Sequence, residues 1–180
     1  MKRKLILAAI LLLAVIVTVL CACNGKNENT VANECLRIHI RANSNSDDDQ
    51  SVKLKVRDEL TAFFSTKLEN CQTKGEAYAT LQAAMPEIEK IAQSILEENY
   101  FDYGATVTLA CEYFPDRQYD EYLFPKGNYD ALVVGLGSAQ GDNWWCVAFP
   151  PLCFVPNGDG EDITYKSWVK EIIDKIFYKS

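Results

Sequence analysis

His39 is the only histidine of the 180-residue chain, so a histidine-based nucleophilic triad or metal site would have to use it. Arg37 and Arg41 alternate with it and would share its face of a strand. A polar segment rich in Asn, Ser and Asp follows at residues 43–49. This cluster could support acid-base chemistry, but a lone histidine on a polar strand face is more often an ordinary half-exposed residue.

The acidic run Asp47-Asp48-Asp49 offers a second chemistry, a carboxylate pair of the kind that glycosidases use. The pattern is nonspecific, because acidic residues at a helix start usually cap its free N–H groups and complement its dipole. No Cys or His pair has the spacing of zinc ligands. We therefore expect no metal, no cofactor and no catalytic residue.

The most unusual segment is residues 141–154, which read GDNWWCVAFPPLCF. Adjacent tryptophans on a strand point to opposite faces, so one of Trp144 and Trp145 can fill the core while the other is presented to a partner. Exposed aromatic side chains commonly anchor protein interfaces, which makes this segment the best candidate for a partner-binding surface. The alternative is that the Pro150-Pro151 turn or the last helix covers the second tryptophan.

The elements that must position these residues follow from apolar periodicity. Alternation predicts strands at residues 36–41 and 106–113, the second ended by Pro115. Helical spacing predicts a helix over residues 52–68 after the cap-rich segment 42–49, and a second apolar stripe over residues 78–96. Pro86 predicts either a kink in that stripe or a division into two short helices.

Two apolar runs, 131–137 and 144–149, are predicted to form a hairpin, and residues 168–177 a last amphipathic helix. Residues 115–129 are predicted to be a long loop or an irregular edge. The order of elements predicts a single α+β domain, a largely antiparallel sheet with helices packed on one face.

The N-terminal segment 1–23 has the layout of an export signal, three basic residues followed by an uncharged apolar stretch. Leu20-Cys21-Ala22-Cys23 resembles a bacterial lipobox, in which Cys23 would be lipidated. Three fates stay open: cleavage and release, lipid anchoring, and retention as an uncleaved membrane helix. Residues 24–34 predict a polar tether, and residues 35–180 the globular domain.

The composition of the chain limits the compartments in which it can act and the partners that it can bind. Five cysteines follow the export segment, so at least one cannot pair within the domain. Cys146 and Cys153 are close enough in sequence for a disulfide outside the cytoplasm, the alternative being buried thiols. The formal net charge of −7 and the lack of a clustered Lys and Arg patch argue against a nucleic-acid partner.

The segment 141–154 resembles the signature of the stage II sporulation protein R family of endospore-forming bacteria. The segment LRIHIRANSNSDDDQSVKLKVRDEL at residues 36–60 is similar to that family's first strand, Ala-Asn-Ser loop and helix. The segment FPKGNYDALVVGLG at residues 124–137 is similar to the strand that precedes the double tryptophan. The resemblance extends over about residues 36–155.

The resemblance implies a signal rather than an enzyme. Members of the family are made in the forespore and exported into the space between the forespore and mother-cell membranes. There they are required for a membrane aspartic protease to process the mother-cell sigma-E precursor. The resemblance thus implies that protease as the partner, and as partner-binding residues Arg37, His39, Asn43, Ser44, Asp49, Gln50, Lys53, Arg57, Asp58, Asn143, Trp144, Trp145, Pro150 and Pro151.

Two rival interpretations remain from the residues alone. One is an envelope hydrolase or peptidoglycan-binding domain that uses His39 and the adjacent acidic loop. The other is a structural envelope protein with no signalling role.

Overall fold

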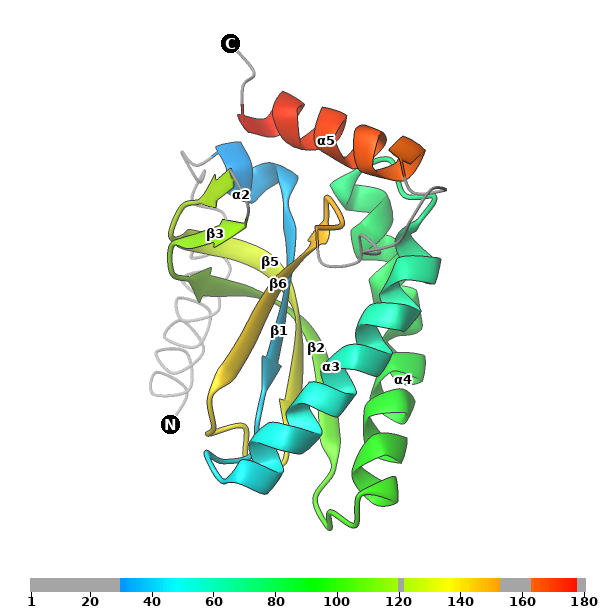
Figure 1. The fold of residues 1–180 in the computed structure, drawn as a ribbon, viewed down its shortest axis with the longest axis vertical. Coiled ribbons are helices and arrows are strands. Elements are labelled where there is room, and N and C mark those ends of the chain that lie inside the picture. The colour runs from blue at the N-terminus through cyan, green and yellow to red at the C-terminus, as the bar shows by residue number, and fades with distance from the viewer. Residues whose placement is uncertain (1–29, 120–121, 153–162, 178–180) are drawn as a thin grey trace, which may run out of the picture.

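A computed structural model describes residues 30–119, 122–152 and 163–177, and Figure 1 shows their arrangement. The helices are α2 (Thr30–Glu34), α3 (Asp47–Leu68), α4 (Lys74–Glu98) and α5 (Ile163–Phe177). The strands are β1 (Leu36–Arg41), β2 (Ala105–Phe114), β3 (Arg117–Tyr119), β4 (Tyr122–Phe124), β5 (Gly127–Leu136) and β6 (Asn143–Phe149). The predicted α+β fold is confirmed.

The main sheet has four strands in the order β2-β5-β1-β6, and β3 pairs with β4 in a small separate sheet. β2 runs antiparallel to β5, and β6 runs antiparallel to β1. β1 and β5 are parallel. The sheet is therefore mixed, with two of its three pairings antiparallel, as the prediction of a largely antiparallel sheet requires.

The predicted hairpin of β5 and β6 is wrong, because β1 lies between these two strands. The turn that links β5 to β6 crosses the end of β1 instead, where Gly141 N donates to Ala42 O and Gln140 N donates to Asn43 O. On the helix-facing side of β1, Leu36, Ile38 and Ile40 are all fully buried. A central place in the sheet buries these residues more completely than an edge would.

Helix α3 begins at Asp47, inside the predicted cap-rich segment, because Ser46 caps it. The Ser46 hydroxyl accepts a hydrogen bond from Asp49 N at 3.2 Å, which satisfies one of the free N–H groups of the first turn. The residues that it buries recur every fourth position and so form one stripe against the sheet. They include Val52, Val56, Leu60 and Phe64.

Helix α4 is one continuous helix of 25 residues with Pro86 inside it. The division into two short helices that Pro86 could have caused does not occur. Leu81, Ala84 and Ile88 are buried on both sides of the proline in the sequence. Their burial outweighs the backbone hydrogen bond that proline cannot donate.

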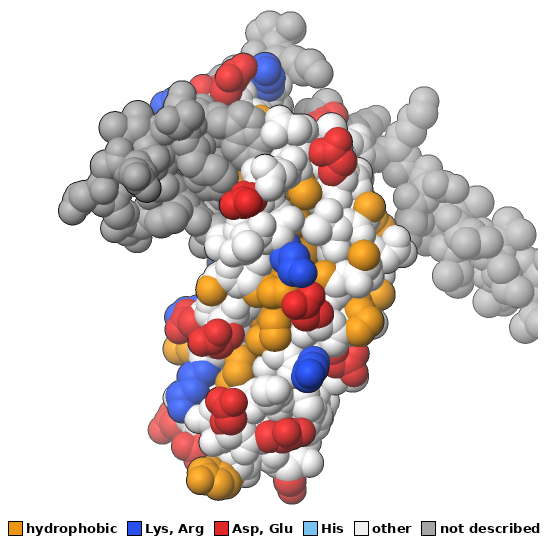
Figure 2. All heavy atoms as spheres, turned by 90° about the vertical axis from the view of Figure 1, so that its right-hand side faces the viewer, with side chains coloured by type: hydrophobic (Ala, Val, Ile, Leu, Met, Phe, Trp, Pro, Cys, Tyr) orange, Lys and Arg blue, Asp and Glu red, His pale blue; other side chains and the backbone are white. Residues whose placement is uncertain are grey.

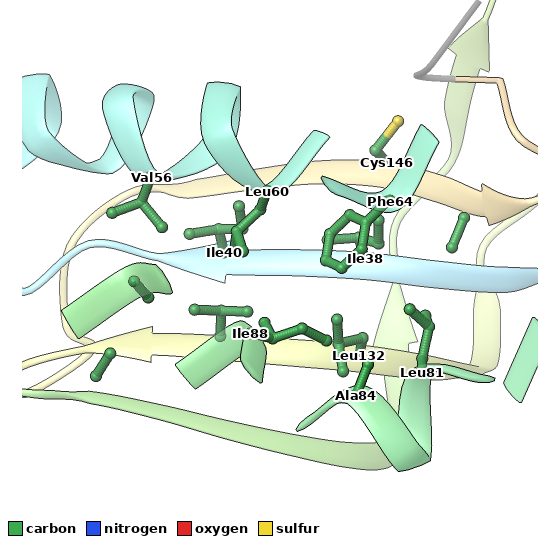
Figure 3. Packing of buried hydrophobic residues seen from close by; sticks show 14 of the residues in the cluster. Ile38, Ile40, Val56, Leu60, Phe64, Leu81, Ala84, Ile88, Leu132 and Cys146 are labelled. Atoms are coloured by element: carbon green, nitrogen blue, oxygen red, sulfur yellow. The ribbon is translucent and has the colours of Figure 1, made fainter. Parts of the chain in front are cut away.

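The main hydrophobic core lies between the sheet and these two long helices. Figure 3 shows side chains of α3 and α4 packed over Ile38 and Ile40 of β1 and Leu132 of β5. The outer face of the helix layer, shown in Figure 2, carries hydrophobic side chains interspersed with acidic and basic ones. The long helices thus occupy one face of the sheet, as predicted.

A second hydrophobic cluster lies on the opposite face, toward one end of the sheet. It combines Val31 and Ala32 of α2 and Ile173 of α5 with residues of β2, β4, β5 and β6. The predicted polar tether therefore ends earlier than Glu34, since Thr30–Glu34 is helical and buries two apolar side chains. A local sequence pattern of five residues is too short to reveal such packing.

Within the described parts of the chain, no helix has both the length and the apolar character needed to cross a membrane. The predicted export segment 1–23 and the lipidation candidate Cys23 lie outside the described residues.

Candidate functional site

The residues that the sequence predicts as partner-binding fall into three separate groups in the structure. Arg37, His39 and Trp145 lie on the sheet face opposite the long helices. A second group, residues 43–53, joins the end of β1 to the start of α3. The third group lies along the side of α3 next to β6 and includes Arg57 and Trp144.

His39 is nearly inaccessible, with 2% of its surface exposed. Its Nδ1 lies 2.7 Å from a carboxylate oxygen of Glu112 in β2, and its ring stacks on Trp145 with centroids 3.8 Å apart. Arg41 donates to the other Glu112 oxygen at 2.6 Å and to His39 Nε2 at 3.4 Å. This geometry fits a neutral imidazole that carries its proton on Nδ1.

Burial lowers the pKa of His39, and the nearby charge of Arg41 acts in the same direction. Hydrogen bonds from Glu112 and Asn143 oppose the shift without reversing it. The imidazole is therefore neutral. It is hydrogen-bonded to both Arg41 and Glu112, which form an ion pair with each other, and it is not exposed to a substrate.

Arg37 is fully buried and has an unusual set of neighbours. Its Nε donates to Cys146 O at 3.0 Å and its Nη2 to the Tyr119 hydroxyl at 3.2 Å, while Nη1 has no hydrogen-bond partner. Burial lowers the pKa of Arg37. The guanidinium carbon lies 4.5 to 5.6 Å from the centroids of four aromatic rings: Phe114, Tyr119, Phe124 and Tyr129.

These contacts give Arg37 a structural role. Each aromatic face attracts the cation, which offsets part of the cost of removing its charge from water. Arg37 thereby joins the small β3–β4 sheet to the main sheet through Tyr119 and Phe124. It is not part of an exposed partner-binding surface.

Asp49 is the centre of the second group. Its Oδ2 accepts hydrogen bonds from Asn43 Nδ2 at 3.0 Å and from the Ser44 hydroxyl at 2.5 Å. Its Oδ1 accepts from the Tyr103 hydroxyl at 2.5 Å. These bonds outweigh the effect of burial and lower the pKa of Asp49, so the carboxylate stays ionised.

The same group joins two loops that are far apart in the sequence. The Asn43 side chain accepts from Ser138 N at 2.8 Å, and Lys53 Nζ donates to Asp142 O at 3.0 Å. Gln50 donates to Ser44 O at 2.8 Å and accepts from Lys53 at 2.6 Å. The loop residues thus have their hydrogen bonds within the protein, where they set the position of β6 relative to α3.

The double tryptophan is divided between the two faces of the sheet, as predicted. Trp145 belongs to the His39 face, and Phe114 meets its ring edge-on at 4.7 Å. Trp144 packs partly against the main core, and the Arg57 guanidinium carbon lies 6.0 Å from its ring centroid. Both tryptophans are half-buried.

Trp144, Arg57 and Leu54 form what we call the tryptophan surface. Leu54 and Arg57 are three residues apart on α3 and so share one side of it, and Leu54 is 41% exposed. Arg57 also pairs with the exposed Asp58 at 2.6 Å. This surface combines an aromatic ring, an aliphatic side chain and a guanidinium, all at least partly exposed.

The remaining predicted residues lie around the two ends of β6. Asn143 is exposed at its start, whereas Pro150 and Pro151 are buried just beyond its end. The two prolines therefore end the strand without contributing exposed surface. Cys146 is disulfide-bonded, whereas Cys35 and Cys71 are free, and the predicted partner, Cys153, lies outside the described residues.

The described residues hold no group of three or more His, Cys, Asp or Glu side chains placed to bind a metal ion. A hollow of about 700 Å³ lies where α5 meets the start of α4. Its lysines are paired inside the protein, Lys74 with Asp130 at 2.8 Å and Lys175 with Glu171 at 2.9 Å. None of the predicted site residues lines it.

Sequence reasoning missed Glu112, Tyr103 and Ser138, which complete the His39 and Asp49 groups. Of these three residues, only Glu112 is conspicuous in the sequence, because it is the one charged residue of its strand. Its partner could not be identified, because His39 lies 73 positions away.

Comparison with known proteins gives two findings. The family described as stage II sporulation protein R matches residues 32–158. The chain is also similar to the stage II sporulation protein R of Bacillus subtilis (strain 168), with 34% identity over 141 residues. That alignment covers 77% of this chain and 63% of the relative, so it spans less than two thirds of the relative's length. No solved structure gives a significant match.

Proposed function

The chain belongs to the stage II sporulation protein R family, and from this membership we propose that it is an exported signalling protein of sporulation. Its target is a membrane aspartic protease, which it activates to process the mother-cell sigma-E precursor. The protein acts in the space between the forespore and mother-cell membranes. The family match over residues 32–158 is the observation that carries this proposal.

The tryptophan surface is the part of the proposed signal that contacts the protease. Tryptophan and arginine are the residues most often responsible for binding energy at interfaces, particularly beside apolar side chains that exclude water. Trp144, Arg57 and Leu54 provide this combination. Arg37, His39 and Asp49 support the proposal indirectly, since their contacts hold the strand and the helix that carry the surface.

Activation requires the signal to bind the active arrangement of the protease more tightly than the inactive one. A ligand with equal affinity for both arrangements would shift nothing. The exported domain can meet this requirement by bringing two protease subunits together or by stabilising one arrangement of the membrane part.

The proposal is tested by co-expressing the full chain with the protease and the sigma-E precursor of the same organism in a host that does not sporulate. Precursor cleavage is followed by immunoblotting. We expect cleavage only when the chain is present and carries residues 1–23. Cleavage without the chain, or no cleavage with it, contradicts the proposal.

The contact surface is tested by Leu54→Asp and Trp144→Ala in the same assay. Loss of an anchor side chain costs about 2 kcal/mol of binding, roughly a 30-fold loss of affinity, so cleavage should fall strongly. Tyr100→Ala is the matched control, because Tyr100 is 97% exposed and lies outside this surface. Equal cleavage by Leu54→Asp and Tyr100→Ala, at equal protein levels, would rule out the tryptophan surface as the contact.

The geometry does not favour the rival hydrolase. A general base must reach its substrate, whereas His39 is buried and both ring nitrogens have partners. Asp49 in the adjacent acidic loop is no better placed to act on a substrate, because it accepts three side-chain hydrogen bonds from within the protein.

A further inference from the structure

Cys146 of β6 carries a disulfide inside the main core. Its side chain is only 2% exposed. It lies opposite Ile38 of β1 and belongs to the same hydrophobic cluster as Phe64 of α3, and Figure 3 labels all three residues. The disulfide is therefore formed on the side of β6 that packs toward the long helices.

The same side of β6 contributes to the tryptophan surface. Trp144 precedes Cys146 by two positions, so both side chains leave the strand on one face of the sheet. Trp144 packs partly against the main core and lies beside the guanidinium of Arg57. Because Arg57 and Leu54 come from α3, the surface exists only while β6 and α3 keep their relative position.

β6 also covers a cation whose burial is unfavourable. Arg37 is fully buried, and its Nε donates to Cys146 O at 3.0 Å. Its Nη1 has no hydrogen-bond partner among the described residues. The aromatic contacts of the guanidinium offset only part of the cost of removing its charge from water. A covalent bond at Cys146 therefore stabilises a strand whose other contacts include a costly one.

The bond at Cys146 is specific to β6. Cys71 belongs to the same hydrophobic cluster and is a free thiol, with its Sγ 3.7 Å from Thr80 Oγ1. The core thus contains both a buried thiol and a buried disulfide. Burial in this core alone does not account for the bond.

Disulfide formation is an oxidation, so it depends on the compartment. One S–S bond forms between Cys146 Sγ and the sulfur of its partner, and the two thiols lose two protons and two electrons. A disulfide oxidant accepts them, and its own S–S bond breaks to give two thiols. The cytoplasm keeps protein thiols reduced, whereas compartments outside it allow disulfides to persist.

We propose that this disulfide is a redox switch for the tryptophan surface. In the reducing compartment where the chain is made, Cys146 is a thiol, and β6 separates from α3 more often. After export the bond forms and fixes the two parts of the surface together. The inference rests on the proposed function for the role of this surface, and it adds that the signal becomes competent only outside the cytoplasm.

The expected size of the effect follows from the constraint that a disulfide places on the unfolded chain. Cys153, the predicted partner, would close a short loop with Cys146. Such a bond favours the folded state by roughly 30-fold or more. Loss of the bond should therefore increase the opening of β6 by at least tenfold.

The switch is tested by hydrogen exchange of the full chain in mild detergent, followed by mass spectrometry before and after reduction with dithiothreitol. We expect the β6 amides to exchange at least tenfold faster in the reduced protein. In Cys146→Ala the bond cannot form, so dithiothreitol should have no further effect. Cys71→Ala is the matched control from the same core and should keep the wild-type response. Equal exchange by the oxidised and reduced wild type overturns the proposal.

The co-expression assay separates the switch from the proposed function. At equal levels of exported protein, Cys146→Ala should lower precursor cleavage at least tenfold relative to Cys71→Ala. Cys153→Ala leaves the Cys146 side chain in the core and should cause the same loss. Cleavage by both variants at the level of Cys71→Ala overturns the switch. If the wild type itself gives no cleavage, the proposed function fails, and the exchange measurement still decides whether the switch exists.

Discussion

The buried polar residues of this protein derive their properties from a few contacts each. His39 is neutral because burial lowers its pKa. It remains hydrogen-bonded because Glu112 accepts a hydrogen bond from its Nδ1 and Arg41 donates one to its Nε2. Arg37 relies on the faces of four aromatic rings, whose centroids lie 4.5 to 5.6 Å from its guanidinium carbon. Both residues stabilise the sheet to which Trp144 belongs.

His39 should make stability depend on pH. Its folded pKa lies below the ordinary value of 6.5, so the unfolded state binds the proton first. The free energy of unfolding should therefore decrease as pH falls below about 6.5, by at most about 1.4 kcal/mol per pH unit. His39→Phe keeps a ring against Trp145 and should remove this decrease. Denaturant unfolding between pH 5 and 7.5 measures both proteins, and an identical pH slope would contradict the assignment.

At the scale of elements, the loops at the end of β1 decide where β6 lies. Two loops that are far apart in the sequence, residues 42–46 and 137–142, are in direct contact through Asn43, Asn45 and Asp142. Gly137 and Gly141 permit this contact. A Cβ at Gly141 would overlap Ser44 O, and a Cβ at Gly137, which has a φ of +56°, would overlap Asn43 Oδ1.

Gly141→Ala should therefore destabilise the protein by about 1 to 3 kcal/mol, since the backbone of Ser44 would have to move. Gly75→Ala is the matched control. A Cβ there meets only Thr73 Oγ1, at an ordinary 3.9 Å, and alanine is the better helix former by up to about 1 kcal/mol. Thermal unfolding should show a lower midpoint for Gly141→Ala and an equal or higher one for Gly75→Ala. A midpoint for Gly141→Ala at or above the wild type would show that the loops can separate without cost.

At the scale of the whole molecule, the cysteines differ sharply in environment. Cys146 is disulfide-bonded, and disulfides persist mainly in oxidising compartments, in agreement with the proposed export. Cys35 and Cys71 are free and buried, whereas Cys111 is exposed. Burial raises the pKa of Cys35 to about 12, so almost none of it is thiolate at neutral pH.

These differences predict an order of alkylation. With iodoacetamide at pH 8, Cys35 and Cys71 should react only after unfolding, and Cys146 only after reduction. Peptide mass spectrometry of the full chain follows these three sites in one sample. Reaction of Cys35 in the folded protein as fast as in the unfolded protein would contradict the buried environment.

The sequence by itself determined the local elements. The strand at residues 36–41 and the helical stripe after the cap-rich segment appear where local patterns predicted them, and the last helix is present but begins earlier, at Ile163. It also determined the family, because the segment around Trp144 and Trp145 is specific enough to be recognised. These features depend on residues within a few positions of one another, where spacing alone fixes which side chains share a face.

Only the tertiary structure decided the strand order and the roles of the candidate residues. In the structure, β1 lies between β5 and β6, Glu112 is hydrogen-bonded to His39, and Arg37 and Asp49 are buried structural groups. The physical reason is that these contacts join residues tens of positions apart. Their stability depends on the total apolar area that one arrangement of the sheet buries. The spacing of residues within one segment does not determine that total area.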